Sequence, residues 1–345
     1  MKVLITGAAG FTARHLSIRL SRESGITVVG TDVHRDRPAF GEFTDYHQAD
    51  LTDEQVVTEL LRKVQPDQIY HLAGVFGGSA PLLYRVNLTA SLHLLEAMRM
   101  LLPDAALLVV GSAAEYGIWP DAEMPLAEDH PCAPVNAYGA SKLAMTEAAR
   151  LYHRAHGLRV VIARPFNLIG AGMPETLVAG AIITRILSVL GDRDPVITVG
   201  NTASERDFVN IDNAVEAYVG MLEAEAWGEV FNISSGRSNS IQEVLDTLVS
   251  FAGKPIRVER DESLVRANDP KLITGDCSKA RNCFGFAPST DLAASLHAAW
   301  KEAASKALQK KLDAAACNKV AKDQVDGGAR VRYNQNQKYW EVIWF

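Results

Sequence analysis

A phenol and a primary amine stand four positions apart in the segment YGASK, as Tyr138 and Lys142. On an α-helix, side chains at this spacing share one face. A lysine ammonium beside a phenol favours the phenolate, so we expect Lys142 to lower the pKa of Tyr138 from its usual value of about 10. Such a phenol exchanges protons near neutral pH, which suits general acid–base catalysis.

A serine upstream is placed to act with this pair. Residues 109–117 read VVGSAAEYG, so Ser112 ends an apolar run that predicts a buried strand. Ligands of open α/β sheets bind outside the carboxyl ends of the strands. Ser112 and Tyr138 can then hydrogen-bond the same substrate oxygen. A carbonyl polarised in this way accepts a hydride at carbon while the tyrosine supplies the proton.

A glycine-rich turn near the N-terminus predicts a dinucleotide site. The segment TGAAGFTA separates a predicted strand from a predicted helix. Its glycines let backbone N–H groups approach a pyrophosphate, and the helix N-terminus adds favourable charge. The next predicted strand ends at Asp32, which can bind both ribose hydroxyls of NAD and repel a 2′-phosphate. NAD is therefore the expected cofactor, while Arg35 and Arg37 keep NADP open as an alternative.

Strands and helices alternate around these residues. The predicted strands are short and nearly continuous apolar blocks, which suit parallel strands covered on both faces; they span Val3–Thr6, Thr27–Asp32, Gln68–Ala73, Ala106–Ser112 and Leu158–Pro165. The predicted helices between them span Ala13–Ser21, Asp53–Val64, Pro81–Leu102 and Ala137–His156. This alternation predicts right-handed βαβ units and an α/β fold with a doubly wound parallel sheet, the Rossmann fold.

The pattern loosens after about residue 170. Helices and short strands mix there, over Thr176–Leu190, Val196–Val199, Ile211–Ala224, Val230–Ser234, Ile241–Ala252 and Ile256–Glu259. We expect an NAD(P)-binding domain over residues 1–170, to which later elements also contribute, and a smaller α/β substrate-binding lobe over residues 171–305. Residues 306–345 form a tail for which the sequence predicts no function.

Composition narrows the class of protein. A formal charge of −6 argues against a nucleic-acid binder, which usually has a basic face. No apolar run reaches the roughly 20 residues that cross a bilayer, and the N-terminus has no signal-peptide pattern, so we expect a cytoplasmic protein that does not bind membranes. The four cysteines show no C-x-x-C spacing and the nine histidines no H-E-x-x-H pair, so we expect no metal site.

Taken together, the motifs resemble those of the extended short-chain dehydrogenases/reductases that modify nucleotide sugars, the NAD-dependent epimerase/dehydratase family. The matching stretches follow the family's order up to about residue 300: TGAAGFTARHL, ADLTD, YHLAG, VNLTASLHLLEA, VGSAAEYG, YGASK, ARPFNLIG, RDFVNIDNAVEAY, FNISSG and LVRANDPKLITGDCSKARNCFGFAP. The second half is most similar to the branch of GDP-4-keto-6-deoxy-D-mannose reductases and GDP-mannose 4,6-dehydratases.

This resemblance implies roles for individual residues. Ser112, Tyr138 and Lys142 match the catalytic triad. The cofactor is expected to contact Gly7, Gly10, Phe11, Thr12, Asp32, Asp50, Leu51, Leu72, Ala73, Gly74, Asn87, Tyr138, Lys142 and Pro165. A nucleotide-diphosphate sugar is expected to contact Ser112, Asn167, Val178, Arg206 and Arg266, and arginine forks suit its phosphate oxygens. The resemblance also implies a homodimer through the helices over Leu82–Leu102 and Tyr138–His156.

The two alanines after Ser112 bear on the reaction type. Dehydratases of this family usually carry Asp-Glu or Ser-Glu there, because eliminating water needs an acid and a base. Ala113 and Ala114 cannot transfer protons, and we place Glu115 on the opposite face of a strand end. We therefore expect a reductase of the C4 keto group of a nucleotide-bound 4-keto-6-deoxyhexose of the GDP-4-keto-6-deoxymannose type. The alternatives are a nucleotide-sugar 4-epimerase, less favourably a 4,6-dehydratase, and a non-catalytic NAD(P)-sensing scaffold.

Overall fold

The computed structural model describes residues 1–265, 269–317, 329–334 and 339–344. The chain divides into two compact units. The first consists of residues 1–168, 204–239 and 267–290, and the second of residues 169–203, 240–266 and 291–345. Two elements placed by the sequence after residue 170, the helix from Ile211 and the strand from Val230, lie in the first unit.

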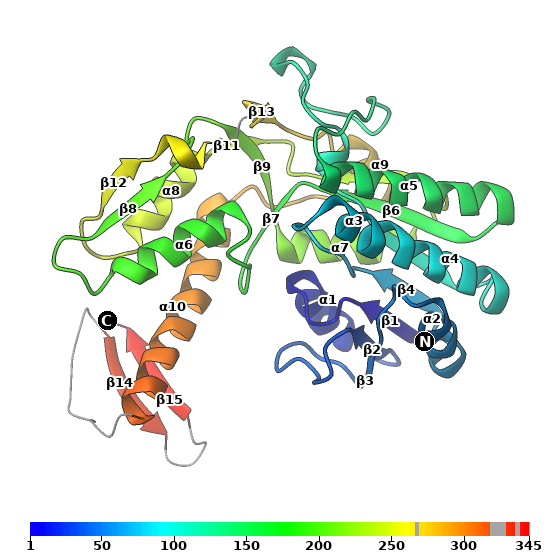
Figure 1. Ribbon diagram of the computed structural model, residues 1–345, viewed down its shortest axis with the longest axis horizontal. Helices are drawn as coiled ribbons and strands as arrows, with labels where there is room; N and C mark the ends of the chain where they lie inside the picture. The colour runs from blue at the N-terminus through cyan, green and yellow to red at the C-terminus, as the bar shows by residue number, and fades with distance from the viewer. Residues whose placement is uncertain (266–268, 318–328, 335–338, 345) are drawn as a thin grey trace. The chain divides into compact units, whose positions relative to one another are not determined.

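A seven-stranded parallel sheet forms the centre of the first unit (Figure 1), in the order β10-β6-β5-β4-β1-β2-β3. Its strands are β1 Lys2–Thr6, β2 Thr27–Asp32, β3 Asp45–Gln48, β4 Gln68–His71, β5 Ala106–Val110, β6 Arg159–Pro165 and β10 Val230–Ile233. Each neighbouring pair runs parallel. The predicted doubly wound fold is confirmed, and burial on both faces explains why the central strands are continuous apolar runs.

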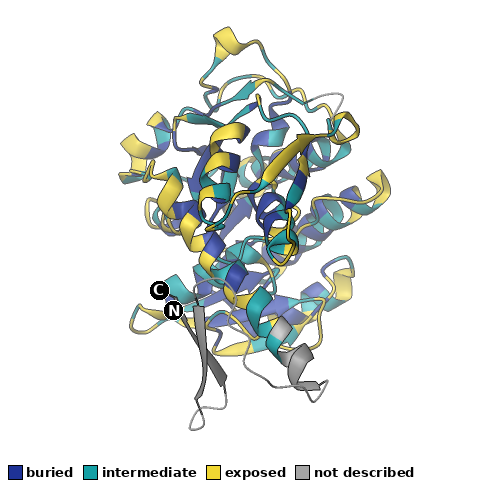
Figure 2. Ribbon diagram, turned by 90° about the vertical axis from the view of Figure 1, so that its left-hand side faces the viewer, coloured by how far each residue is buried: buried dark blue, intermediate teal, exposed yellow. Residues whose placement is uncertain are grey.

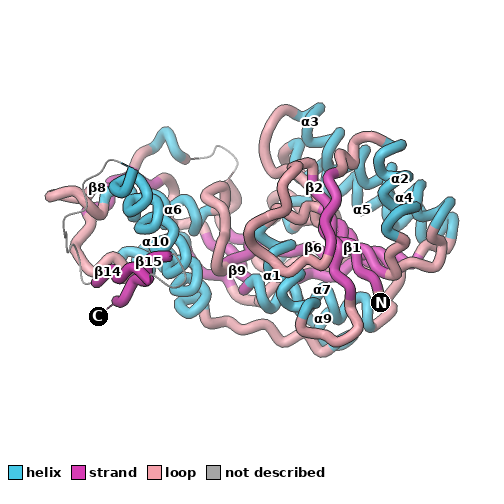
Figure 3. Tube along the Cα trace, turned by 90° about the horizontal axis from the view of Figure 1, so that it is seen from below, coloured by secondary structure: helices cyan, strands magenta, loops and turns pink. Residues whose placement is uncertain are grey.

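Helices cover both faces of this sheet (Figure 3). They are α1 Phe11–Ser21, α2 Glu54–Val64, α3 Ala80–Tyr84, α4 Ala90–Leu101, α5 Ala137–His156, α7 Ile211–Glu223 and α9 Ser278–Phe284. In β1, Val3 and Ile5 pack into the core shared with α1 and α7, whereas Leu4 packs into the core shared with α2, α4 and α5. Burying each such side chain contributes about 1.5–3 kcal/mol, and Figure 2 shows buried positions concentrated on the strands and inner helix faces.

The predicted helix over residues 81–102 is interrupted. A π-helical turn, η1 Arg85–Thr89, separates α3 from α4. Asn87 lies in this turn and is fully buried, where its side chain exchanges two hydrogen bonds with the backbone of Val75. Single π-turns are frequent at functional sites because they redirect one side chain. This turn directs an amide into the interior beside the carboxyl end of β4.

A smaller sheet joins β11 Ser238–Ser240, β9 Glu205–Asn210 and β13 Leu272–Ile273, and β7 Asn167–Ile169 also pairs with β9. Four backbone and side-chain donors bind the fully buried carboxylate of Asp207 in β9. Those donors belong to Ser235, Gly236 and Gly275. Asp207 therefore ties the loop after β10 and the segment after β13 to the small sheet.

The second unit contains three described helices, α6 Val178–Val189, α8 Ile241–Ser250 and α10 Leu292–Cys317, which pack against one another. Strand β8 Val196–Val199 pairs in parallel with β12 Arg257–Arg260. Strands β14 Ala329–Asn334 and β15 Tyr339–Trp344 pair antiparallel within the tail. Of the helices in the described residues, none has the length and apolar character to span a membrane.

Candidate active site

The structure brings the three predicted catalytic residues to the carboxyl end of β5. Ser112 lies two residues beyond that strand, and Tyr138 and Lys142 occupy the first turns of α5. The Ser112 side chain lies close enough to Tyr138 to affect the pKa of its phenol, and Lys142 Nζ donates to the carbonyl of Val110 over 2.9 Å. A Cβ on Gly139 would lie 2.3 Å from the carbonyl oxygen of Ala114, so the glycine of YGASK lets α5 approach the Ser112 turn.

Burial controls the protonation of this pair. Desolvation raises the pKa of Tyr138, the side chain of Ser112 opposes that shift, and the charge of Glu115 adds to it. Burial lowers the pKa of Lys142 to about 8, against the opposing effect of Glu115. The expected lowering of the pKa of Tyr138 by Lys142 is therefore wrong, because desolvation penalises the phenolate and the ammonium donates to the Val110 carbonyl. At neutral pH the phenol holds its proton.

A buried chain of hydrogen bonds begins at β1. The Ala73 N–H donates to Thr6 Oγ1 over 3.1 Å, and Thr6 Oγ1 lies 2.8 Å from His71 Nδ1. Across the ring, His71 Nε2 lies 2.8 Å from Ser91 Oγ, and Ser91 donates to the carbonyl of Asn87. Ser91 must then accept from Nε2–H, which leaves Nδ1 to accept from Thr6. Burial, aided by the charge of Lys142, lowers the pKa of His71 to about 3, so its ring is neutral.

The chain continues from the π-turn to the catalytic helix. Asn87 Nδ2 donates to Ser141 Oγ over 3.0 Å, and Ser141 Oγ donates to the carbonyl of Tyr138 over 2.8 Å. A Cβ on Gly74 would lie 3.1 Å from Asn87 Oδ1 and 3.2 Å from Lys142 Nζ, so these three residues meet. The sequence identified Asn87, but not Thr6, His71 or Ser91. The chain joins the strand before the glycine turn to the helix that bears the phenol.

The glycine turn fits a dinucleotide. Gly7 has a φ of 68°, and a Cβ there would lie 2.8 Å from the backbone nitrogen of Ala73. Gly10 is the N-cap of α1 and, being a glycine, has no side chain that could cap the helix. The first backbone N–H groups of α1 are therefore suited to bind an anion. Asp32 Oδ2 accepts from the Ala9 N–H over 3.0 Å, which holds its carboxylate beside the turn. These features fit a pyrophosphate and an adjacent ribose.

The other predicted cofactor residues lie along the carboxyl edge of the sheet, where ligands of such sheets bind. Phe11 and Thr12 begin α1, and Pro165 ends β6. Asp50 and Leu51 follow β3, a strand absent from the prediction, and Leu72 and Gly74 follow β4. Asp50 Oδ1 accepts two hydrogen bonds from Thr52, and Leu51 is buried.

The predicted substrate residues belong to several different elements. Asn167 Nδ2 donates to the carbonyl of Asp207 over 2.9 Å, on the small sheet. Arg206 donates to the carbonyl of Pro270 over 2.8 Å and forms an ion pair with Asp269 at 2.5 Å. Val178 begins α6 in the second unit. Arg266 lies outside the described residues.

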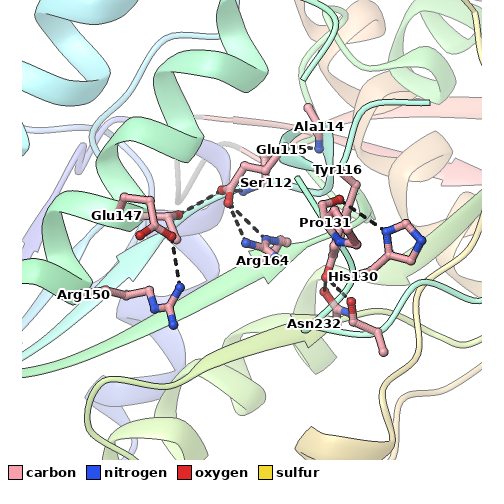
Figure 4. Close-up of polar contacts among 12 residues, drawn as sticks. Ser112, Ala114, Glu115, Tyr116, His130, Pro131, Glu147, Arg150, Arg164 and Asn232 are labelled. Atoms are coloured by element: carbon pink, nitrogen blue, oxygen red, sulfur yellow. Dashed lines mark hydrogen bonds and ion pairs between the residues drawn. The ribbon is translucent and has the colours of Figure 1, made fainter. Parts of the chain in front are cut away.

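Sequence reasoning misplaced Glu115. Residues 113–115 form a 3-10 helix, η2, so the alternation of a strand does not apply to them. Glu115 is fully buried and pairs with Arg164, its Oε2 lying 2.9 Å from Nη2 and 3.1 Å from Nε (Figure 4). Removing one partner of a buried ion pair typically costs about 3–5 kcal/mol. The pattern S-x-x-E at residues 112–115 is a capping-box signal that could have revealed this turn.

The remaining oxygen of Glu115 is occupied as well. Oε1 accepts from the Ser112 N–H over 2.8 Å and from Thr146 Oγ1 over 3.1 Å. A carboxylate offers about four acceptor sites, and these two bonds with the two from Arg164 use them all. Glu115 therefore has no lone pair left for proton transfer to a ligand, although it stands three residues from Ser112.

Comparison with known proteins places this geometry in a family. Residues 3–234 match the model of the NAD-dependent epimerase/dehydratase family. The chain is 26% identical to GDP-6-deoxy-D-mannose reductase of Pseudomonas aeruginosa, over 86% of this chain and 95% of that protein. It is 30% identical to UDP-glucose 4-epimerase of Corynebacterium glutamicum, over 87% of this chain and 95% of that protein.

A solved structure agrees with these sequence matches. The fold superimposes on RMD from Pseudomonas aeruginosa complexed with NADPH with a TM-score of 0.78, at 25% identity over 88% of this chain and 99% of that chain. Both the expected enzyme class and the expected cofactor type are thereby confirmed. The chain belongs to the NAD-dependent epimerase/dehydratase family and is an NAD(P)-dependent enzyme that modifies nucleotide sugars.

Proposed function

We propose that this enzyme reduces the C4 keto group of a nucleotide-bound 4-keto-6-deoxyhexose, of the GDP-4-keto-6-deoxymannose type. One observation carries the proposal. The phenol of Tyr138 is half-buried, lies beside Ser112 and has a pKa raised by desolvation, so it holds the proton that the product alcohol needs. Bound NAD(P)H would supply the hydride.

In the proposed mechanism, Ser112 donates a hydrogen bond to the carbonyl oxygen of the sugar. Tyr138 transfers its proton to this oxygen as negative charge develops there. Lys142, held by the carbonyl of Val110, would contact the bound cofactor. The buried chain through His71 and Asn87 keeps α5 in register with the glycine turn during these steps.

The proposed cofactor site uses the carboxyl edge of the sheet. The pyrophosphate would bind at Gly7, Gly10 and the first turn of α1, and the ribose hydroxyls at Asp32. The diphosphate of the sugar nucleotide would bind Arg206 and Arg266, whose guanidinium groups suit phosphate oxygens.

The division into a cofactor domain and a substrate lobe remains a prediction of the sequence.

Dehydration is disfavoured by the residues that follow Ser112. Ala113 and Ala114 carry no ionisable group, and all four acceptor sites of Glu115 are engaged. Elimination needs a base for a C–H bond and an acid for the leaving hydroxyl. Reduction needs only one group that donates a proton, and the phenol of Tyr138 is such a group. The similarity to GDP-6-deoxy-D-mannose reductase also supports reduction over dehydration.

A nucleotide-sugar 4-epimerase is the second candidate, because the chain is 30% identical to UDP-glucose 4-epimerase of Corynebacterium glutamicum. An epimerase must first oxidise its substrate, which requires the phenol to accept a proton before it donates one. Because the raised pKa of Tyr138 keeps its phenol protonated at neutral pH, the resting enzyme already holds the proton that reduction donates, whereas oxidation would first require removal of that proton. This difference favours the reductase.

The test is to incubate the purified protein with GDP-4-keto-6-deoxymannose and NADPH or NADH, and to follow cofactor absorbance and sugar products. We expect one cofactor oxidised per 6-deoxyhexose formed. Interconversion of UDP-sugars without net cofactor consumption, on protein that retains tightly bound NAD, would instead establish the epimerase. Cofactor binding with no effect of any sugar nucleotide would establish the non-catalytic alternative.

We also propose a homodimer through α4 and α5. Met100 on α4 is 51% exposed and Leu151 on α5 is 53% exposed, and burying these apolar side chains against a second copy would be favourable. Light scattering of the purified protein should give the mass of two chains, whereas the double variant Met100→Glu with Leu151→Glu should give the mass of one chain.

Localisation in the cytoplasm remains a prediction of the sequence.

A further inference from the structure

The orientation of Ser112 depends on a reciprocal pair of hydrogen bonds within its own turn. Its N–H donates to Glu115 Oε1 over 2.8 Å, and its Oγ accepts from the Ala114 N–H over 3.1 Å. The first bond fixes the backbone of Ser112, and the second occupies one lone pair of the hydroxyl. The hydroxyl hydrogen is left for a different acceptor, on the side where Tyr138 lies.

Besides the Ser112 N–H, two further residues hold the carboxylate of Glu115. Arg164 of β6 binds Oε2 with two nitrogens of its guanidinium, and Thr146 of α5 donates to Oε1. A Cβ on Gly111 would lie 2.3 Å from Oε1, so the carboxylate fills space that only a glycine leaves open. Arg164 is in turn stacked 4.5 Å over the ring of Tyr116. Glu115 therefore links the turn after β5 to α5 and β6.

We propose that Glu115, fixed by Arg164, is a positioning residue that aims the Ser112 hydroxyl at the carbonyl oxygen of the substrate. This inference rests on the proposed function, since it assigns Ser112 a role in the reaction. Its physical basis is that a donor assists the reaction only if it already points to where negative charge develops, so that no reorganisation is needed at that moment.

The charge of Glu115 has a second effect at the same site. It raises the pKa of both residues, so it adds to the effect of burial on Tyr138 and opposes the effect of burial on Lys142. In the part of the chain that the structure describes, the other groups that act on these two residues are uncharged: Ser112 and Tyr218 beside Tyr138, and the neutral ring of His71 beside Lys142. Loss of this charge should lower the pKa of Tyr138. The fall in reduction rate on the alkaline side should then move to lower pH.

Two double variants separate positioning from mere structural support. E115Q/R164M removes both charges but keeps a carbonyl oxygen that can accept from the Ser112 N–H. E115L/R164M removes both charges and the acceptor. We expect E115L/R164M to lose about 100-fold in kcat, as when a donor to a developing oxyanion is lost, and E115Q/R164M to be about tenfold faster than it or more. The KM for NAD(P)H should stay the same in both.

A third comparison tests whether Glu115 acts through Ser112. If it does, adding E115L/R164M to Ser112→Ala should reduce kcat no further than about twofold, because residues that act as a unit are not additive. Full additivity of the two losses would overturn the proposal. The proposal would also be overturned if the two double variants had equal kcat and equal thermal stability, because the acceptor for the Ser112 N–H would then make no difference.

The outcomes also distinguish this proposal from the proposed function. Wild-type protein is assayed first with GDP-4-keto-6-deoxymannose and, if it is inactive, for epimerisation of UDP-glucose. Activity in the second assay alone would overturn the proposed reductase function. The positioning role of Glu115 would still predict the same order of kcat among the variants in that assay. If E115L/R164M does not fold, Glu115→Asp takes its place, because its charge remains but its carboxylate is withdrawn from the Ser112 N–H. Wild-type kcat in that variant would contradict the proposal.

Discussion

Two buried polar networks converge on α5, and they differ in charge. The chain from Thr6 through His71 and Asn87 consists of neutral groups, each with a complementary partner. The network around Glu115 is built on an ion pair with Arg164. The neutral chain connects the cofactor turn to the catalytic helix, whereas the charged network sets the turn of Ser112 and the electrostatic potential at the phenol. The neutral chain thus contributes alignment alone, whereas the charged network adds an electrostatic effect to that of burial.

The largest effect should come from removing the group that both networks serve. Tyr138→Phe deletes the proton donor, and we expect kcat to fall by about 10²–10⁴-fold, the usual contribution of a positioned acid or base. Steady-state kinetics on the sugar substrate measure this loss, with NAD(P)H affinity as the control. A variant with wild-type kcat would remove Tyr138 from the mechanism.

Breaking the charged network at one partner should have the largest effect on stability. Arg164→Met leaves the carboxylate of Glu115 buried without its ion pair, and we expect the free energy of unfolding to fall by about 3–5 kcal/mol. Urea denaturation gives this value. The matched control is E115Q/R164M, which should regain most of the loss because no charge remains buried; equal stability of the single and double variants would argue against a buried pair.

Breaking the neutral network should cost less. His71→Leu leaves the hydroxyl of Thr6 without an acceptor and that of Ser91 without a donor, and an unsatisfied buried group costs about 1–3 kcal/mol. We expect weaker NAD(P)H binding as well, because Thr6 directly precedes the glycine turn. Denaturation and cofactor titration measure the two effects. The prediction fails if His71→Leu is as destabilising as Arg164→Met or leaves cofactor binding unaltered.

The last effect concerns acid stability, and it develops only as the pH falls below about 6.5. The pKa of His71 falls from about 6.5 in the unfolded chain to about 3 in the folded protein, so the unfolded state binds more protons between these values. The stabilising contribution of the neutral ring is complete above pH 6.5 and is lost progressively as the pH falls toward 3. In His71→Leu, the dependence of unfolding free energy on pH should be shallower over this window. An unchanged slope would place the titration elsewhere.

The sequence predicted the central part of the fold well, and the reason is physical. Strand β2 spans Thr27–Asp32 and helix α5 spans Ala137–His156, as the pattern indicated. The strand is a continuous apolar run because both of its faces are buried, and the helix has periodic apolar residues because one of its faces is buried. Strand β3, Asp45–Gln48, escaped prediction since its residues are polar and it lies at the sheet edge. The strands of the small sheet are short, and pairing partners far along the chain determine them.

The site shows the same division. The spacing of Tyr138 and Lys142 indicated a shared helix face, which is a local property. The protonation of the phenol is not local, because it depends on desolvation by the whole surrounding core. The ion pair of Glu115 likewise joins residues 49 positions apart, and only the three-dimensional fold brings them together. Local patterns therefore reveal which groups are present, whereas packing decides their charge and orientation.

The most direct test of the reductase is the fate of the hydride. The enzyme is given GDP-4-keto-6-deoxymannose with NAD(P)H that carries deuterium at the transferable position, and the sugar is analysed by mass spectrometry and NMR. We predict a 6-deoxyhexose product with one deuterium at C4 and a matching amount of oxidised cofactor. A sugar product without deuterium, formed while the added cofactor stays reduced, would contradict the account.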